Sequence, residues 1–273
     1  MSSEEILITV ITSTMNCADS LEKTAKSIQM QTNRKIQWIV ADGGSIDNTL
    51  NVIIANTGLI TDWFSAPDSG IYDAWNKASK LIRGEWVIFL GAGDSFCNVS
   101  VLEQAEAKLS NSKLKNTYIC YGNVYLKDET NILSSGEVCL NHWDIYRPKL
   151  PLHQGVFHRS ILFLNQKPFD DTYQIVADSK FLLLAKSKAD FYYLNIDVSE
   201  MEPGGVSANP KHAVNVMKEF LRLEKDLEYK LPRFNKMRYI ISCYAKSFLY
   251  KGIGTKLTNK IILLKRWLSD LNG

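Results

Sequence analysis

The sequence predicts an α/β fold in which a parallel β-sheet is flanked by helices. In the first 110 residues, four apolar stretches of strand length alternate with four stretches of helix length, the usual order in a helix-flanked parallel sheet. The five residues Trp86–Leu90 are all apolar, as in a strand that is buried on both faces. Polar residues and glycines follow the predicted strands, and such sheets bind their ligands at these strand ends.

The elements can be predicted in order along the chain. The four strands are expected at residues 6–12, 35–41, 60–66 and 86–90. The helices that follow them are expected at 19–31, 47–55, 71–82 and 98–109. Asp19 or Ser20 suits the cap of the first helix, and Asp47 suits the start of the second. Beyond residue 110 we expect shorter strands at 118–126, 132–138, 173–177 and 191–198, a helix at 179–186, and helices from residue 211 onward.

Composition and charge exclude several classes of protein. The chain has 273 residues, of which 45% are hydrophobic and 22% charged, so it can form a large core in one or two domains. A net charge of +3 is too small to indicate nucleic-acid binding. The five cysteines are odd in number and include no CxxC pair, which favours reduced thiols and a cytoplasmic protein. We expect neither a signal peptide nor a transmembrane helix.

Three aspartates follow predicted strands by one to a few residues. They are Asp42, Asp68 and Asp94. Because the carboxyl ends of parallel strands meet at one edge of the sheet, we expect these three carboxylates to line one crevice. Any one of them could instead cap the helix that follows it. That alternative weakens when all three lie at the same edge.

Asp94 is preceded by the small residues Gly91, Ala92 and Gly93. Glycines allow a backbone to approach another group closely, so this carboxylate suits a metal ion or a ribose. It could instead cap the helix predicted at 98–109. Neither a GxGxxG nor a GxxxxGK[ST] motif is present, so we expect neither a Rossmann dinucleotide site nor a P-loop.

The carboxy-terminal segment is basic and rich in aromatic residues. Residues 233–273 contain nine Lys or Arg and a single acid, Asp270. A basic amphipathic helix of this kind can lie on an anionic membrane surface. The alternative is a set of helices that pack on the body and expose a solvated basic face. The sequence leaves both interpretations open.

Five motifs resemble, in this order, those of a bacterial family 2 glycosyltransferase: IVADGGSIDNT, APDSGIYDAWNKA, GEWVIFLGAGD, PLHQGVFHR and VADSKFLL. The resemblance covers about residues 6–207 and is closest to the branch that builds O-antigens, capsules and exopolysaccharides. It implies the GT-A type of α/β fold, a mixed sheet flanked by helices. Residues 1–110 would be the nucleotide-binding half, residues 111–210 the acceptor half, and residues 211–273 a basic helical extension.

The resemblance also implies roles for residues at matching positions. Asp94 matches the last carboxylate of the family's metal-binding motif and would hold Mn²⁺ or Mg²⁺. Asp178 matches the general base. Asp42 would accept a hydrogen bond from the N3–H of uracil. The other residues expected to bind the nucleotide sugar are Thr12, Asp68, Asp73, Asn76, Lys77, Gly93, His153 and Gln154.

The implied activity is inverting sugar transfer, of the hexosyltransferase type, from a nucleotide diphosphate, with a UDP-sugar as the expected donor. The acceptor would be a hydroxyl of a polyprenyl-diphosphate-linked or glycan molecule, and the enzyme would be peripheral on the inner face of the cell membrane. A divalent cation offsets the charge of the departing diphosphate, and a carboxylate must take the acceptor's proton. One departure is that the family usually has a second acid where this chain has Gly93. The alternative hypothesis is therefore a non-catalytic nucleotide-sugar-binding protein.

Overall fold

The structure is a computed structural model that describes residues 8–127, 132–134, 143–144, 147–165, 167–202, 205–207, 209–228 and 233–270. The chain divides into two compact units. The first comprises residues 1–139 and 150–202, and the second comprises residues 140–149 and 203–273. Every residue predicted to bind or to catalyse belongs to the first unit.

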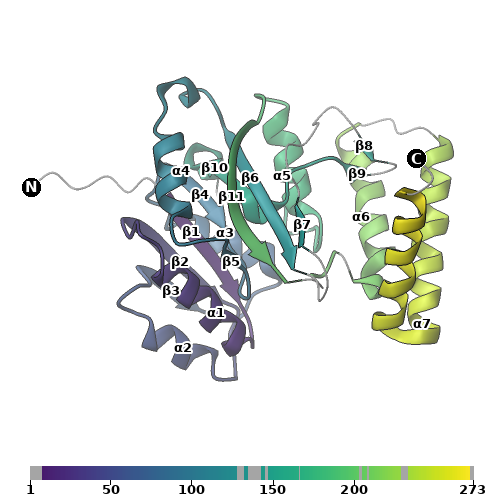
Figure 1. Cartoon of the computed structure of the whole chain (residues 1–273), viewed down its shortest axis with the longest axis horizontal. Helices are drawn as coiled ribbons and strands as arrows, with labels where there is room; N and C mark the ends of the chain where they lie inside the picture. Colours follow the sequence, from purple (N-terminus) through teal and green to yellow (C-terminus); the bar gives the residue numbers. More distant parts are fainter. Residues whose placement is uncertain are drawn as a thin grey trace, which may run out of the picture. The chain divides into compact units, whose positions relative to one another are not determined.

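In the part of the chain that the structure describes, nine strands form one mixed sheet in the order β3-β2-β1-β4-β10-β6-β11-β5, with β7 paired to β6 (Figure 1). The strands β3, β2, β1 and β4 are parallel neighbours. Strand β10 runs antiparallel to both β4 and β6, and β11 runs parallel to β6. The bounds are β1 Ile8–Thr14, β2 Ile36–Asp42, β3 Asp62–Ser65, β4 Trp86–Phe89, β5 Ser95–Phe96, β6 Ile119–Lys127, β7 Ile132–Ser134, β10 Val156–Arg159 and β11 Tyr192–Met201. The predicted mixed α/β sheet is thus confirmed.

Helices cover both faces of this sheet. Residues of α1, α2 and α4 share one apolar cluster with Val10, Trp38 and Ile88 of the strands. On the other face lies a cluster of aromatic side chains. The ring centroids of Trp75 of α3 and Phe89 are 4.5 Å apart, and Phe181 of α5 belongs to the same cluster. The helices are α1 Ala18–Gln29, α2 Thr49–Ala55, α3 Ile71–Ser79, α4 Val101–Leu109 and α5 Ala177–Lys186, with short 3₁₀ turns η1 Ser112–Leu114, η2 His153–Gly155 and η3 Ser160–Phe163.

The predicted central strand forms the middle of this core. All residues of Trp86–Leu90 are almost completely buried. Because side chains alternate along a strand, Ile88 contacts the helices of one face and Phe89 the aromatic cluster of the other. Burying each such side chain stabilises the fold by roughly 1.5–3 kcal/mol.

The strand predicted at 173–177 is wrong. Tyr173 lies in a turn, with its amide bonded to the carbonyl of Asp170 at 3.1 Å, and α5 begins at Ala177. Tyr173 and Val176 are buried without joining the sheet. An apolar run of this length does not distinguish a buried strand from a buried loop. Of the strand predicted at 132–138, Ile132–Ser134 is confirmed as β7, and the remainder lies outside the described residues.

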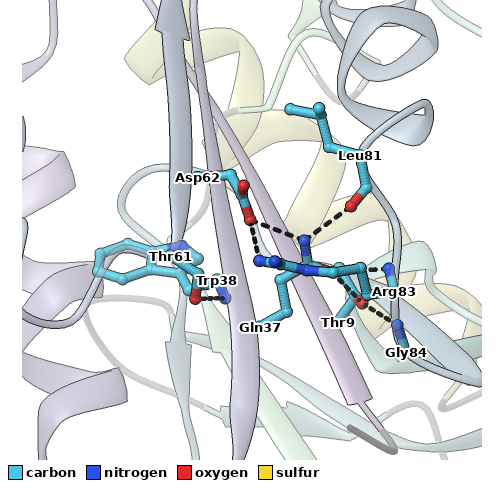
Figure 2. Close-up of polar contacts among 8 residues, drawn as sticks. All are labelled: Thr9, Gln37, Trp38, Thr61, Asp62, Leu81, Arg83 and Gly84. Atoms are coloured by element: carbon cyan, nitrogen blue, oxygen red, sulfur yellow. Dashed lines mark hydrogen bonds and ion pairs between the residues drawn. The ribbon is translucent and has the colours of Figure 1, made fainter.

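A polar network holds the amino-terminal ends of the parallel strands together (Figure 2). Gln37 of β2 accepts hydrogen bonds from the hydroxyl of Thr9 and the amide of Arg83, both at 2.8 Å. Its amide nitrogen donates to Asp62 at 2.8 Å and to the carbonyl of Leu81 at 2.7 Å. The guanidinium of Arg83 also pairs with Asp62 at 2.5 Å. Gln37 thus makes all four hydrogen bonds that its side-chain amide allows.

The second unit is helical, as predicted from residue 211 onward. It contains η4 Pro210–His212, α6 Ala213–Asp226 and α7 Arg233–Asp270, together with the small hairpin β8 Trp143–Asp144 and β9 Arg147–Pro148. Helices α6 and α7 contact each other, and Glu224 pairs with Lys236 at 2.8 Å. Helix α7 is kinked at Gly254, whose φ is +74°. Within the described ranges we find no helix with the length and hydropathy needed to cross a membrane.

Candidate active site

Asp94 follows β4 on a turn that two glycines shape. A Cβ at Gly91 would lie 2.9 Å from Asp94 Oδ2, so glycine leaves room for the carboxylate to turn back, and the Gly91 amide donates to Oδ2 at 3.2 Å. Gly93 has a φ of +102°, which an L side chain rarely adopts. Thr24 of α1 binds this turn, since its hydroxyl accepts from the Gly93 amide at 3.0 Å and donates to the Asp94 carbonyl at 2.8 Å. The turn therefore fixes one carboxylate at the end of β4.

The alternative role of Asp94 as a helix cap is wrong. Helix α4 begins at Val101, and no side chain caps it. Burial instead raises the pKa of Asp94 to about 7, with the negative charge of Glu202 acting in the same direction and the Gly91 amide opposing. A buried carboxylate with so little compensation is a group that a cation would stabilise.

A divalent cation fits this carboxylate only with help from a ligand. Among the described residues, no group of three or more His, Cys, Asp or Glu side chains could hold a metal ion. Mg²⁺ and its relatives are often bound by one or two carboxylates together with phosphate oxygens of the substrate and water. Asp94 fits this arrangement, as one protein carboxylate that would share the ion with the phosphates of a bound nucleotide.

Asp178 is the second residue of α5 and is partly buried. Its Oδ1 accepts hydrogen bonds from the Ser179 amide at 2.7 Å and from the Tyr72 hydroxyl at 3.2 Å. Burial raises the pKa of Asp178, while the hydrogen bonds from Ser179 and Tyr72 oppose the shift. Because Val176 occupies the cap position of α5, Asp178 is not the helix cap.

Tyr72 of α3 links Asp178 to the other half of the sheet. Its hydroxyl lies 2.7 Å from the carbonyl of Ile175 and 3.2 Å from Asp178, and its single proton can satisfy only one of them at a time. When the proton is donated to Ile175, the tyrosine oxygen can accept one from a protonated Asp178. A hydrogen bond between Tyr72 and Asp178 is therefore possible in both charge states of Asp178.

The carboxylate of Asp42 is fully hydrogen-bonded to protein groups. It is completely buried at the end of β2. Its carboxylate accepts from the amide of Ser45 at 2.9 Å, the hydroxyl of Ser45, and the hydroxyl of Ser65 at 2.6 Å. It therefore lies at the predicted edge without lining a crevice there. It does not cap the next helix either, because α2 begins at Thr49 and its cap position is Asn48. Its role in binding uracil stays a prediction.

Three further residues expected to bind the donor are buried among protein groups. Thr12 accepts from the indole nitrogen of Trp38 at 3.0 Å. Asn76 clamps the backbone of Phe169 through two hydrogen bonds of 2.9 Å. His153 of η2 stacks on Trp75 with 4.9 Å between ring centroids. Burial holds the pKa of this histidine well below its ordinary value, so it is neutral. The side chains of Thr12 and Asn76 are buried and bonded to protein groups, so their contact with a donor stays a prediction.

The remaining predicted residues are accessible. Asp68 accepts from the Gly70 amide at 3.0 Å, and Asp73 accepts from the Ser69 amide at 3.0 Å. Lys77 pairs with Asp73 at 3.0 Å and donates to the carbonyl of Pro67 at 2.9 Å. Gln154 of η2 is partly buried beside β11. A cavity of about 190 Å³ opens at the start of α3, lined by Ser69, Gly70, Ile71, Tyr72, Asp73, Asp171, Tyr173 and Gln174.

Sequence reasoning did not identify Tyr72 as part of the site. Its partners Ile175 and Asp178 are about a hundred positions away along the chain, and no local pattern indicates that contact. The only available signal was its place beside Asp73 in the second motif. Ser65, which holds Asp42, was missed for the same reason.

Comparison with known proteins identifies the class of this chain. The model of a protein family described as glycosyl transferase family 2 matches residues 9–158, more than half of the sequence. The chain belongs to this family, and the protein is a glycosyltransferase. The matched residues include β1 to β4, Asp94 and the HQG segment at His153.

Curated relatives agree with this assignment. The chain is 29% identical over 221 residues to a PGL/p-HBAD biosynthesis glycosyltransferase of Mycobacterium bovis, covering 79% of this chain and 83% of the relative. It is 25% identical over 134 residues to the Escherichia coli protein WfaP, a UDP-Glc:α-D-GlcNAc-diphosphoundecaprenol β-1,3-glucosyltransferase. That match covers 47% of this chain and 51% of WfaP.

Solved structures share the fold. Staphylococcus aureus TarS 1-349 in complex with UDP superposes with a TM-score of 0.61 at 18% identity, covering 89% of this chain and 72% of TarS. The mannosyltransferase PcManGT of Pyrobaculum calidifontis, in complex with GDP-Man and Mn²⁺, gives a TM-score of 0.63 at 13% identity and covers 98% and 81%. At these identities the likeness supports the GT-A fold alone.

Proposed function

We propose that this glycosyltransferase moves a sugar, with inversion, from a UDP-sugar to a hydroxyl of a lipid-linked or polysaccharide acceptor. The carrying observation is the pair of carboxylates, Asp94 and Asp178. Both are partly buried with raised pKa values, and they come from different halves of the sheet. Sugar transfer needs one group at the leaving diphosphate and a second at the attacking hydroxyl.

Asp94 serves the donor in this proposal. Mn²⁺ or Mg²⁺ bound there would offset the negative charge of the diphosphate as a Lewis acid. Asp73 in the first turn of α3 and Lys77 in its last turn form a partly exposed ion pair, which ribose or phosphate oxygens could contact. The UDP complex of TarS and the Mn²⁺ complex of PcManGT support the same assignment by analogy. The donor is proposed to be UDP-linked on the further ground that WfaP is described as using UDP-Glc.

Asp178 serves the acceptor. A sugar hydroxyl is a weak nucleophile, and transferring its proton to a positioned carboxylate accelerates attack by roughly 10²–10⁴-fold. The raised pKa of Asp178 makes it a stronger base than an exposed aspartate. The cavity beside Tyr72 is also lined by Asp171, whose carboxylate can accept a hydrogen bond from a sugar hydroxyl, whereas Asp73 is assigned to the donor. We assign the Asp171 side of this cavity to the acceptor.

Helix α7 is proposed to hold the enzyme on the inner membrane surface. Its apolar side chains Met237, Ile241, Tyr244 and Phe248 recur every three or four residues and are more than half exposed. Such a stripe beside basic residues suits an anionic bilayer surface. The full-length chain should bind anionic vesicles at low salt, and a chain that ends before Arg233 should not. Equal binding of the two chains would refute the role of α7.

The activity is tested by a panel of nucleotide sugars with Mn²⁺. A UDP-sugar at 100 times its dissociation constant should stabilise the protein by about 2.7 kcal/mol, seen as a higher melting temperature. The same donor should then be hydrolysed slowly or transferred to a lipid-linked acceptor. Stabilisation without any turnover would favour the non-catalytic alternative. Stabilisation by GDP-sugars in preference to UDP-sugars would contradict the assigned donor.

A further inference from the structure

The turn that carries Asp94 lacks the second acid usual for the family, and its backbone explains why. Gly93 has a φ of +102°. An aspartate at this position would be strained, since L side chains rarely adopt this conformation. A carboxylate that assists Asp94 must therefore come from another part of the chain.

The sheet brings one such carboxylate to the same place. Strands β5 and β11 pair antiparallel, with Phe96 opposite Ser199 and Ser95 opposite Glu200. Gly93 lies two residues before Ser95, and Glu202 lies two residues after Glu200, just past the end of β11. Glu202 follows β11, more than a hundred residues after the glycine turn.

Helix α1 contacts both sides of this pairing. Lys23 binds Glu202 through an ion pair of 2.7 Å. Ser20, three residues earlier, packs against Gly93, where an added Cβ would lie 3.6 Å from the Ser20 Cβ. The side chains of Lys23 and Glu202 are both 58% exposed, so the ion pair is open to a ligand.

We propose that Glu202 is the second carboxylate of the donor site and that it faces, together with Asp94, the divalent cation of the nucleotide sugar. This inference rests on the proposed function, because it assumes that a cation binds at Asp94. In the free protein, Lys23 offsets the charge of Glu202. With the cation present, two carboxylates and the diphosphate oxygens supply the oxygen ligands that Mn²⁺ and Mg²⁺ prefer.

The test measures Mn²⁺ binding to the full-length protein by electron spin resonance, first with Mn²⁺ alone and then with Mn²⁺ and UDP. Glu202→Gln should raise the dissociation constant of Mn²⁺ in the presence of UDP by at least about tenfold. Glu200→Gln is the matched control, because it removes a negative charge from the same strand next to Ser95, and it should stay within about twofold. Both variants should melt near the unmodified protein, since exposed ion pairs add little stability.

Lys23→Gln separates ligand binding from a purely structural role. If Glu202 only anchors Lys23, then Lys23→Gln and Glu202→Gln would behave alike and neither would change Mn²⁺ affinity, which overturns the proposal. The proposal predicts instead that Lys23→Gln retains or tightens Mn²⁺ binding, because the competing cation is gone.

Asp94→Asn shows whether a negative result concerns Glu202 alone or also the proposed function. If Asp94→Asn abolishes Mn²⁺ binding while Glu202→Gln binds like Glu200→Gln, the inference about Glu202 is wrong and the proposed function stands. If Asp94→Asn binds Mn²⁺ as tightly as the unmodified protein, both the donor role of Asp94 and the role of Glu202 are overturned.

Discussion

Polar side chains at the two ends of the parallel strands differ in how completely they are hydrogen-bonded. At the amino-terminal ends, Gln37 makes every hydrogen bond that its amide allows, to Thr9, Asp62, Leu81 and Arg83 (Figure 2). At the carboxyl ends, Asp94 receives one backbone hydrogen bond of 3.2 Å, and burial raises its pKa to about 7. A fully hydrogen-bonded network stabilises the fold. A buried carboxylate with few hydrogen bonds destabilises it, and a bound cation can offset that destabilisation.

Asp42 shows that position alone does not decide the role. It lies at the same edge as Asp94, yet it is buried and holds Ser45 and Ser65. In its hydrogen bonding it resembles Gln37 more than Asp94. We therefore separate the polar residues of the site into those that are saturated, which build it, and those that are not, which bind and react.

The largest effect is expected from Asp94→Asn. This change keeps the shape of the side chain but removes the charge that the cation needs. A Lewis acid contributes several kcal/mol to such reactions, so turnover should fall by roughly 10³-fold or more. Steady-state transfer from the UDP-sugar measures this. Activity within tenfold of the unmodified protein would mean that Asp94 is not at the donor.

Asp178→Asn should have the next largest effect. Turnover should fall by roughly 10²-fold or more while the affinity for UDP survives, because only proton transfer is lost. Turnover should also rise with pH through the raised pKa of Asp178, since the base acts when deprotonated. Near-normal turnover in the variant would remove the general base from the account.

At the opposite edge, Gln37→Leu should reduce stability without affecting chemistry. It leaves the partners of Gln37 unsatisfied in the interior, which costs about 1–3 kcal/mol for each group that water cannot reach. We expect the free energy of unfolding in urea to fall by a few kcal/mol and turnover of the folded protein to remain. Gln104→Leu, on the exposed face of α4, is the control and should change stability by about 0.5 kcal/mol or less. A loss of turnover that exceeds the loss of folded protein would contradict the separation of the two edges.

A separate effect concerns the dependence of stability on pH at Asp94. An unfolded aspartate has a pKa of about 3.9, and the folded value is about 7. Stability of the cation-free protein should therefore decline as pH rises from 4 to 7, by up to about 1.4 kcal/mol per pH unit from this group. Asp94→Asn should be the more stable protein at pH 8 in chelator and should lose that advantage at pH 4. An advantage of equal size at both pH values would argue against the raised pKa.

Much of the fold follows from local sequence signals. The four parallel strands and their helices were predicted because buried strands such as Trp86–Leu90 have continuous apolar runs and end at glycines. The prediction of a strand at 173–177 failed because Tyr173 is buried at the end of a turn, beneath the Lys180 ammonium, and not by strand pairing.

The site was predictable only in part. Asp94 and Asp178 follow from their motifs, but hydrogen-bond saturation depends on residues that are distant in sequence. Asn76 looks like a ligand-binding amide until its two bonds to Phe169 are known. Likewise, the contact between Tyr72 and Asp178 and the ion pair between Lys23 and Glu202 exist only once the chain has folded.

The division of labour between Asp94 and Asp178 is tested most directly by calorimetric titration of UDP with Mn²⁺ into the unmodified protein, Asp94→Asn and Asp178→Asn. We predict that Asp178→Asn binds the nucleotide as tightly as the unmodified protein and that Asp94→Asn loses the Mn²⁺-dependent part of the affinity. Equal affinities in the two variants, or a loss confined to Asp178→Asn, would contradict the account.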